Sequence, residues 1–269
     1  MKTIAVIGAK GMLGLAVSEY FSRRGDRVIP LTRKEFDIAR DPLGRLEDLL
    51  SDARHVVNCA GVIKPLIAQT PPEDVLKVNA IFPRNLARLC DRSGAQLFHV
   101  TTDCVYSGRD GGYDENAFFD AEDVYGLSKN AGDAADCMVL RTSIIGEERG
   151  QQRSLLEWAR SQAGKEVNGF LNHRWNGVTT LHLAEVIDKI IEDGLYERGI
   201  FHVHSPETVT KHELVSMLSD VYELGLTIHP VDADEACDRS LTSARPLCAR
   251  LDVKPLRQQF AELRDFFST

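Results

Sequence analysis

The sequence lacks the features of proteins that bind nucleic acids or membranes. Its 269 residues include 40 acidic and 32 basic side chains, for a formal net charge of −8, whereas phosphate backbones are bound by clustered cations. No stretch approaches the roughly 18 apolar residues of a membrane span, and no basic amphipathic run indicates a membrane surface. We therefore expect a cytoplasmic protein with neither nucleic acid nor membrane as a partner.

Signals for disulfides and metals are also lacking. The six cysteines are Cys59, Cys90, Cys104, Cys137, Cys237 and Cys248. They are scattered and include no CxxC pair, which favours reduced thiols over a disulfide framework. His202 and His204 lie two residues apart on a predicted strand, but no third ligand accompanies them, so we predict structural histidines and no metal site. The apolar opening MKTIAVIGAKGMLG is short and broken by glycines, and it is predicted to be a first strand.

What is present is an alternation of short β-branched runs with helical patterns. Strands are predicted at residues 3–7, 27–31, 55–59, 96–100, 138–142 and 200–204. Helices are predicted near residues 11–24, 42–51, 73–92, 125–134 and 180–193. Most of the strands are apolar on both faces, as in a sheet that helices cover on both sides. The pattern predicts an α/β fold with a Rossmann-like, doubly wound parallel sheet.

The first predicted strand ends in a glycine-rich turn. The run GAKGMLG places Gly8, Gly11 and Gly14 at the junction with the first helix, with Met12 and Leu13 between them. Glycines there allow a tight turn and let a pyrophosphate approach the backbone at the helix N-terminus. The spacing GxxGxxG departs from the commoner GxGxxG, but its place at the start of a βαβ unit predicts a dinucleotide site. The alternative is a turn that binds nothing.

The residues after the second predicted strand indicate which dinucleotide is bound. An acid at this position would hold the adenosine ribose of NAD, but the sequence has Thr32, Arg33 and Lys34. Cations suit a 2′-phosphate, so NADP(H) is predicted, with NAD still allowed, and Glu35 lies past the usual position. The alternative is that Arg33 and Lys34 belong to a solvated loop.

The run YGLSK places Tyr125 and Lys129 four residues apart on a predicted helix, so they share one face. With a nicotinamide cofactor implied, the phenol can give a proton to the alkoxide that hydride transfer to a ketone produces. The ordinary pKa of a phenol, about 10, makes the phenolate costly at neutral pH, and a neighbouring ammonium would lower that pKa. Thr101 and Thr102, at the end of the fourth strand, offer a second donor, with a turn or helix cap as the alternative.

Two interruptions of the alternation predict a smaller substrate-binding region. Residues 147–177 hold a helix near 152–163, then the polar run GFLNHRWNGVT, which we predict to be a loop. Residues 205–269 hold a helix with a capping box from Thr210 to Glu213 and a helix near 255–267. We expect residues 1–146, completed by about 178–204, to form the NADP-binding core. The two interrupting segments should lie at the C-terminal edge of the sheet, where ligands bind in this architecture.

Six runs together resemble one known family. They are GAKGMLG (8–14), NCAG (58–61), VNA (78–80), TTDCVYSG (101–108), YGLSKNAGD (125–133) and LRTSIIG (140–146). The chain is similar to the extended short-chain dehydrogenases/reductases, and within them to the dTDP-4-dehydrorhamnose reductases and related nucleotide-sugar 4-ketoreductases. The resemblance is strong over residues 1–146 and looser beyond.

The resemblance implies a role for each matched position. Thr102 would assist the substrate oxygen, Tyr125 would donate the proton, and Lys129 would bind the nicotinamide ribose and tune the tyrosine. Asn79 would hold backbone in place. The remaining cofactor contacts would be Asn58, Ala60 and Gly61 on the adenosine side, Asp37 and Ile38 at the adenine, and Thr101, Thr142 and Ser143 near the nicotinamide.

Departures from the family pattern concern the substrate pocket. Ile144 stands where the rhamnose-pathway enzymes have a tryptophan, and Cys104, after Asp103, stands where they have a tyrosine. A loop of the family is replaced by NHRWNGVT, whose Arg174, Trp175 and Asn176 could contact a sugar or base or could anchor the loop by packing. Arg239 is a candidate for the nucleotide diphosphate, with a surface charge as the alternative. These changes keep the chemistry and predict a substrate other than dTDP-4-dehydrorhamnose.

The leading hypothesis is NADPH-dependent reduction of a 4-keto group on a nucleotide-activated deoxy sugar, for polysaccharide biosynthesis. One alternative is a nucleotide-sugar epimerase or epimerase-reductase on the same scaffold. Another is a non-catalytic NADP-binding regulatory subunit, because the β subunit of methionine adenosyltransferase resembles the same subgroup. The sequence allows a homodimer, and it leaves open the oligomeric state, the nucleotide, the sugar and the stereochemistry at C4.

Overall fold

The computed structural model describes residues 1–150 and 154–268. Its centre is a six-stranded sheet in the order β10-β5-β4-β3-β1-β2, with every neighbouring pair parallel. The strands are β1 (Thr3–Ile7), β2 (Arg27–Leu31), β3 (His55–Asn58), β4 (Gln96–Thr102), β5 (Met138–Thr142) and β10 (Gly199–His202). The Rossmann-like α/β prediction is confirmed, and all six predicted strands are present.

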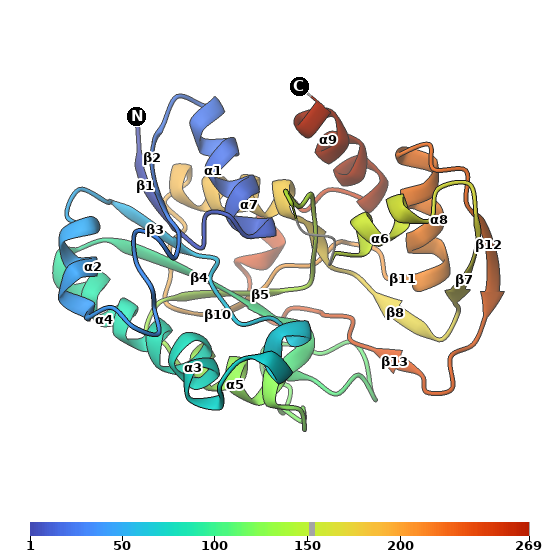
Figure 1. Cartoon of the computed structure of the whole chain (residues 1–269), viewed down its shortest axis with the longest axis horizontal. Coiled ribbons are helices and arrows are strands. Elements are labelled where there is room, and N and C mark those ends of the chain that lie inside the picture. The colour runs from blue at the N-terminus through green and yellow to red at the C-terminus, as the bar shows by residue number, and fades with distance from the viewer. Residues whose placement is uncertain (151–153, 269) are drawn as a thin grey trace.

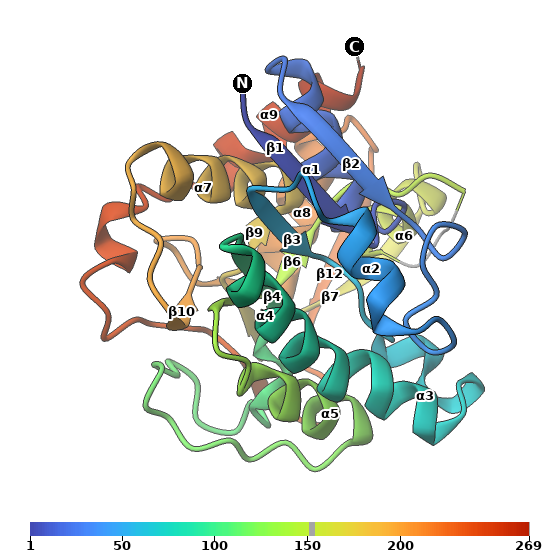
Figure 2. The same cartoon turned by 90° about the vertical axis from the view of Figure 1, so that its left-hand side faces the viewer.

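Helices cover both faces of this sheet (Figures 1 and 2). One face carries α1 (Met12–Arg23) and α7 (Thr180–Glu192), and the other carries α2 (Leu43–Leu49), α4 (Phe82–Ser93) and α5 (Val124–Asp133). The strands alternate between two cores: Ile4 and Val6 contribute to the α1/α7 core, and Ala5 and Ile7 to the α2/α4 core. Burial of each large apolar side chain contributes about 1.5–3 kcal/mol, so these double-sided strands define the sheet.

The predicted helix at 73–92 is divided by a π-helical turn. It consists of α3 (Pro72–Leu76), the π turn Lys77–Ile81 and α4. Pro83 lacks the amide hydrogen that would otherwise bond the carbonyl of Asn79, which accounts for a widened turn at this point. The carbonyl of Asn79 instead faces α5, where a β-carbon on Gly132 would lie 2.1 Å from it.

The prediction of a loop over residues 169–179 is wrong. This segment contributes to β7 (Glu166–Phe170), β8 (His173–Trp175) and β9 (Val178–Thr179). Their partners are distant in sequence: β7 pairs with β12 (Thr227–Val231), β8 with β11 (Val209–Thr210) and β13 (Cys237–Asp238), and β9 with β6 (Ile144–Ile145). These strands are too short and too polar for local patterns to predict, and long-range pairing forms them.

The predicted helices of this region are present as α6 (Leu155–Ser161), α8 (Lys211–Val221) and α9 (Leu256–Ser268). Residues 152–153 of the predicted first helix lie outside the described residues. The capping box is confirmed, because the Thr210 hydroxyl accepts from the Glu213 amide at 3.1 Å and the Glu213 carboxylate accepts from the Thr210 amide at 2.7 Å. In the described part of the chain, no helix is long and apolar enough to cross a membrane.

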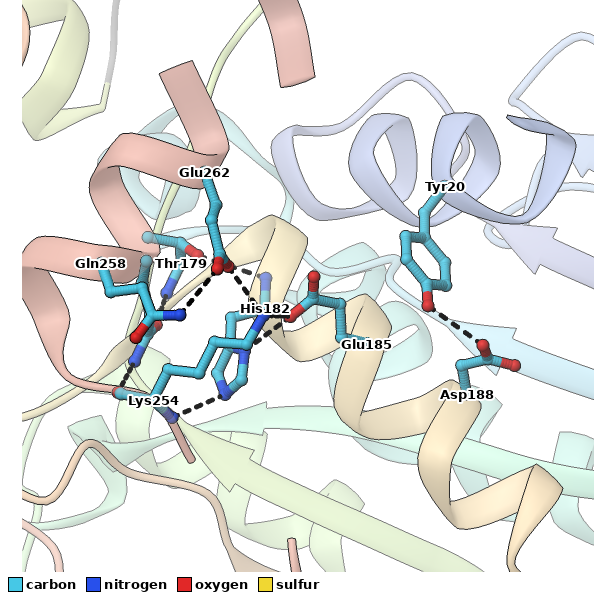
Figure 3. A network of polar contacts seen from close by, with 9 residues as sticks. Tyr20, Thr179, His182, Glu185, Asp188, Lys254, Gln258 and Glu262 are labelled. Carbon is cyan, nitrogen blue, oxygen red and sulfur yellow. Dashed lines mark hydrogen bonds and ion pairs between the residues drawn. The ribbon is translucent and has the colours of Figure 1, made fainter. Parts of the chain in front are cut away.

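Polar contacts join α9 to α7, as Figure 3 shows. The ammonium of Lys254 bonds the carboxylates of Glu185 on α7 and Glu262 on α9, at 2.8 and 2.7 Å. His182 lies beneath it, with Nδ1 2.8 Å from Glu185. About one turn further along α7, the Tyr20 hydroxyl of α1 donates to Asp188 at 3.0 Å. The C-terminal helix is thus attached to the central core as well as to α8.

Candidate active site

The candidate site lies at the C-terminal ends of the central strands. β1 ends before the Gly8 turn, β3 before residues 59–61, β4 at Thr102 and β5 at Thr142. Because these strands are parallel neighbours, their ends meet at one edge of the sheet. Helix α5, which carries Tyr125 and Lys129, packs against β4 (Figure 1).

The glycine turn has the geometry that a bound pyrophosphate requires. Gly8 has φ of 81°, and a β-carbon there would lie 2.9 Å from the amide nitrogen of Ala60. A β-carbon on Gly14 would lie 2.1 Å from the carbonyl oxygen of Gly8, so α1 packs this closely on the turn only because glycine is present. Gly11 is the N-cap of α1, and no described side chain caps that helix, which leaves the amides of Met12 and Leu13 without side-chain acceptors. Phosphate groups bind to such helix N-termini.

The segment after β2 has two exposed cations, and its acid, Glu35, is hydrogen-bonded within the segment. Arg33 and Lys34 are exposed. The Glu35 carboxylate accepts from the amide and hydroxyl of Thr32, at 2.8 and 2.5 Å, and these bonds hold the pKa of Glu35 below its ordinary value. Nearby, the Asp37 carboxylate accepts from the amide of Ala39 at 2.9 Å, and Ile38 is half-buried.

Thr102 connects the end of β4 to the tyrosine. Its hydroxyl donates to Asp103 at 3.2 Å and accepts from the amide of Cys104 at 3.1 Å, and it lies close enough to the phenol of Tyr125 to act on the pKa of that group. Asp123 caps α5 by accepting from the amide of Gly126 at 2.8 Å, which fixes the first turn that carries the tyrosine. The structure therefore brings together two residues that are 23 positions apart in the sequence.

Lys129 is buried, with 5% of its surface exposed. Its ammonium donates to the carbonyl of Val100 at 3.4 Å and lies 3.8 Å from the position of a β-carbon on Gly61. Burial lowers the pKa of Lys129, and Asp133 and Cys59 oppose that shift. Burial also raises the pKa of Tyr125, and the nearby Thr102 hydroxyl opposes that rise only in part. The expected acidification of Tyr125 by Lys129 is therefore not found in the chain by itself, because desolvation of the phenol dominates.

A second set of polar contacts supports this arrangement from β3 and the π turn. The Asn58 amide nitrogen lies 3.1 Å from Nδ1 of His99, and the Asn58 side-chain oxygen accepts from the amide of Ala60 at 3.2 Å. The Asn79 side chain bonds both backbone groups of Val62, at 2.8 and 3.0 Å, and donates to Ser128 on α5 at 3.0 Å. Asn79 thus has the structural role that was predicted.

Comparison with known proteins identifies the family. The family model described as RmlD substrate binding domain matches residues 1–267. The chain belongs to this family. A probable low-salt glycan biosynthesis reductase of Haloferax volcanii is 27% identical over 92% of this chain and 89% of its own, and a dTDP-4-dehydrorhamnose reductase of Mycolicibacterium smegmatis is 26% identical over 97% and 84%. The solved dTDP-4-dehydrorhamnose reductase of Bacillus anthracis, in complex with NADP, superposes with a TM-score of 0.83 at 21% identity, covering all of both chains.

One further relative has a different description. The methionine adenosyltransferase 2 subunit beta of Danio rerio is 27% identical to this chain over 83% of its residues and 75% of that protein. Similarity at this level of identity therefore does not by itself separate a reductase from a subunit of another enzyme.

The residues predicted to contact the substrate come from three segments of this RmlD-family chain. Asp103 is buried, Cys104 and Ile144 are half-buried, and burial raises the pKa of the Cys104 thiol to about 12, as expected for a pocket-lining group. Arg239 donates to the carbonyls of Tyr106 and Ser107, at 2.8 and 3.0 Å. The buried hydroxyl of Thr142 donates to the carbonyl of Ser143 at 3.1 Å. The buried hydroxyl of Thr101 has no partner among the described residues.

The predicted substrate contacts of Trp175 and Asn176 need correction. Trp175 is buried in the C-terminal core with Leu181 and Leu214. Both polar atoms of the Asn176 side chain bond the backbone of Leu241, at 2.7 and 2.9 Å. These two residues therefore anchor the segment, Trp175 by packing and Asn176 by its bonds to the Leu241 backbone. Arg174 pairs with Thr210 of β11 and with Asp238 of β13, and its side chain is exposed.

Sequence reasoning missed two charged residues. Lys211 is the first residue of α8, and it acts electrostatically on Asp103 and Cys104. Burial lowers its pKa, which Asp103 opposes. Asp133, at the end of α5, pairs with Arg141 at 2.7 Å. Asp133 was detectable as the residue one turn beyond Lys129, whereas no local signal places Lys211 near Asp103.

The predicted structural histidines are hydrogen-bonded. Nε2 of His202 lies 3.1 Å from the Arg141 guanidinium and Nδ1 lies 2.8 Å from the carbonyl of Thr242. The strand ends at His202, so His204 does not share its face, and Nδ1 of His204 lies 2.9 Å from the carbonyl of Ser205. No group of three or more metal-ligating side chains occurs within residues 1–150 and 154–268.

Proposed function

We propose that this protein reduces a 4-keto group on a nucleotide-activated deoxy sugar with NADPH, in polysaccharide biosynthesis. The observation that carries this proposal is the junction of Thr102, Tyr125 and Lys129 at the same sheet edge as the glycine turn, in a member of the RmlD family. The relatives named as reductases act on such sugars or build glycans, by their printed descriptions.

The residues at the cofactor end fit a dinucleotide. Gly8 and Gly14 leave the space that a β-carbon would fill, and the N-terminus of α1 favours a pyrophosphate. Arg33 and Lys34 suit a 2′-phosphate, whereas Glu35, the acid that follows them directly, is already bonded to Thr32. NADPH is therefore favoured over NADH. The remaining cofactor contacts follow the matched positions: Asp37, Ile38, Asn58, Ala60, Gly61, Thr101, Thr142 and Ser143.

Reduction requires a hydride, which the nicotinamide supplies, and a proton, which the chain supplies. Tyr125 would give its proton to the oxygen that was the 4-keto group, while Thr102 holds that oxygen by a second hydrogen bond. Lys129 would bind the nicotinamide ribose and stabilise the phenolate that remains. With the cofactor and substrate bound, the side chains of Tyr125 and Thr102 would take the place of the water that otherwise surrounds the reacting oxygen.

The substrate would lie between the sheet edge and the region formed by residues 147–177 and 205–269. Asp103, Cys104 and Ile144 would line its sugar pocket, and Arg239 would approach its diphosphate. With Ile144 in place of an aromatic platform, we propose a sugar other than dTDP-4-dehydrorhamnose. We also propose a cytoplasmic location, where nucleotide sugars are made, and a homodimer, which light scattering of the purified protein tests.

Turnover of a panel of 4-keto nucleotide sugars tests the function. NADPH consumption should be detected with at least one of them and should fall by about 10²–10⁴-fold in Tyr125→Phe, which removes the proton donor. Tyr196→Phe is the matched control, because that hydroxyl bonds the carbonyl of Leu97 away from the site. Absence of NADPH oxidation across the panel would contradict a reductase.

The second candidate is an NADP-binding regulatory subunit. The observation that favours it is the 27% identity to methionine adenosyltransferase 2 subunit beta. This candidate predicts NADPH binding without turnover and stable association with a methionine adenosyltransferase catalytic subunit. An epimerase would instead keep its cofactor through purification and interconvert two sugars without net oxidation.

A further inference from the structure

The buried environment of Lys129 disfavours the charged form of its ammonium group. Its ammonium is buried and has one hydrogen-bond acceptor among the described residues, the carbonyl of Val100 at 3.4 Å. Removing an ammonium from water favours its neutral form. The proposed role at the cofactor ribose requires the charged form, so something in the structure must compensate.

Among the described residues, Asp133 is the carboxylate that acts electrostatically on Lys129. Burial raises the pKa of Asp133, and the Arg141 guanidinium opposes that rise most strongly. It follows Lys129 by four residues on α5, so Tyr125, Lys129 and Asp133 lie along one face of the helix. Asp133 is only 4% exposed. An acid in the last turn of a helix opposes the helix dipole, so helix stability does not account for it.

Arg141 holds Asp133 in place. Two nitrogens of its guanidinium bond Oδ2 of Asp133, at 2.7 and 3.2 Å, while Oδ1 has no partner among the described residues. Arg141 itself is fully buried in β5 and bonds the Tyr106 hydroxyl at 2.8 Å and His202 at 3.1 Å. The carboxylate thus uses one oxygen for Arg141, and the hydroxyl of Thr101, which likewise has no partner among the described residues, acts on the same carboxylate.

We propose that Asp133 is a positioning residue for Lys129: it is the buried counter-ion that keeps the ammonium charged at the sheet edge, with Arg141 fixing its place. The other titratable groups that act on this pair cannot replace it. Cys59 and His99 approach Lys129 from β3 and β4, and Tyr106, Cys137 and Arg141 approach Asp133. None of these groups carries a negative charge at neutral pH, because burial raises the pKa values of the two thiols and of Tyr106 and so keeps them protonated.

The test is the pH dependence of NADPH binding and of kcat/KM in Asp133→Asn. Loss of the counter-ion lets Lys129 deprotonate at lower pH. The alkaline limbs of both profiles should therefore move down by about one pH unit or more, and NADPH affinity at pH 8 should fall about tenfold. Asp133→Glu should largely restore the wild-type profile. Asp136→Asn is the matched control: this acid lies three residues later, its side chain is 78% exposed, and it pairs with Arg198.

Asp133→Asn leaves Arg141 buried without its acid, which destabilises the fold. The double variant Asp133→Asn/Arg141→Met removes both charges and should keep the shifted profile, because Lys129 still lacks its counter-ion. A folded single or double variant with an unshifted profile would overturn the proposal.

The inference rests on the proposed function for the role of Lys129, but the binding assay separates the two. If NADPH binding shows the shift and no sugar is reduced, the counter-ion proposal stands and the reductase proposal fails. If turnover is observed and neither pH profile moves in the variants, the reductase proposal stands and the counter-ion proposal fails.

Discussion

Gly126 packs directly against the carbonyl oxygen of Cys104: a β-carbon at this position would lie 2.4 Å from that oxygen and 2.5 Å from the β-carbon of Ala121. The glycine follows Tyr125, and the carbonyl belongs to the turn that begins at Thr102. The absence of one methyl group therefore sets the distance between the proposed proton donor and its partner hydroxyl.

Gly126→Ala should impair catalysis more than stability. The new methyl group must push α5 away from the end of β4, which costs about 1–3 kcal/mol, and a displacement of about 1 Å at the tyrosine should lower kcat by up to about 10²-fold. Steady-state kinetics and thermal unfolding measure the two effects. Gly44→Ala on α2 is the control, because a β-carbon there meets open space. Wild-type kcat in Gly126→Ala would contradict the packing argument.

Gly14→Ala should weaken NADPH binding. A β-carbon there would lie 2.1 Å from the Gly8 carbonyl, so α1 must move off the turn that is proposed to bind the pyrophosphate. We expect at least a tenfold loss of affinity, about 1.4 kcal/mol, in a fluorescence titration. The Gly44→Ala protein should bind as the wild type does. An unchanged affinity would remove the glycine turn from the cofactor site.

His202 should make stability depend on pH under acidic conditions. Burial, followed by the nearby Arg141 charge, lowers the pKa of His202 from 6.5 to about 4. Between these values the unfolded chain binds the proton and the folded chain does not, so stability falls as the pH decreases from 6.5 to 4, by about 3 kcal/mol for this group. Denaturant unfolding at a series of pH values measures it.

The histidine can be tested by substitution. His202→Gln should be less stable at pH 7, because the bond from Arg141 is altered, and its stability should vary less between pH 6.5 and 4. His229→Gln is the control, since that ring is exposed beside Glu166. An equally steep pH dependence in His202→Gln would assign the effect to other groups, such as the buried His99, whose pKa burial also lowers.

Lys211→Met should raise KM for the nucleotide sugar more than it lowers kcat. Lys211 acts on Asp103 and Cys104 at the substrate side, and a cation there would attract the phosphates of the substrate. We expect KM to rise about tenfold, equivalent to about 1.4 kcal/mol, with partial recovery in Lys211→Arg. Lys189→Met, which removes an exposed pair with Asp193, should leave KM unchanged. A selective loss of kcat would indicate a different role.

Several parts of the site follow from local sequence signals. The central strands are apolar on both faces, as in β4 with Leu97 and Phe98 facing opposite cores. Glycine spacing marked the turn after β1, and the four-residue separation of Tyr125 and Lys129 placed them on one helix face. These features depend on the spacing of side chains along a strand or helix and on the backbone freedom of glycine, and both are properties of residues that are neighbours in the sequence.

Other parts depend on segments that only folding brings together. β8 and β13 have no strong pattern and form because they pair, which buries Trp175 and turns it away from the substrate region. The π turn arises where Pro83 meets α5, and the carbonyl of Asn79 becomes a packing surface for Gly132.

The sequence by itself determined the doubly wound sheet, the glycine turn and the tyrosine–lysine helix, because each is written in the spacing of nearby residues. Only the tertiary structure decided which charged groups lie close to these features and how deeply they are buried. Whether Lys129 keeps its proton, and whether Lys211 meets Asp103, depends on burial and on partners from distant segments, since electrostatic energies follow distance in space and access to water.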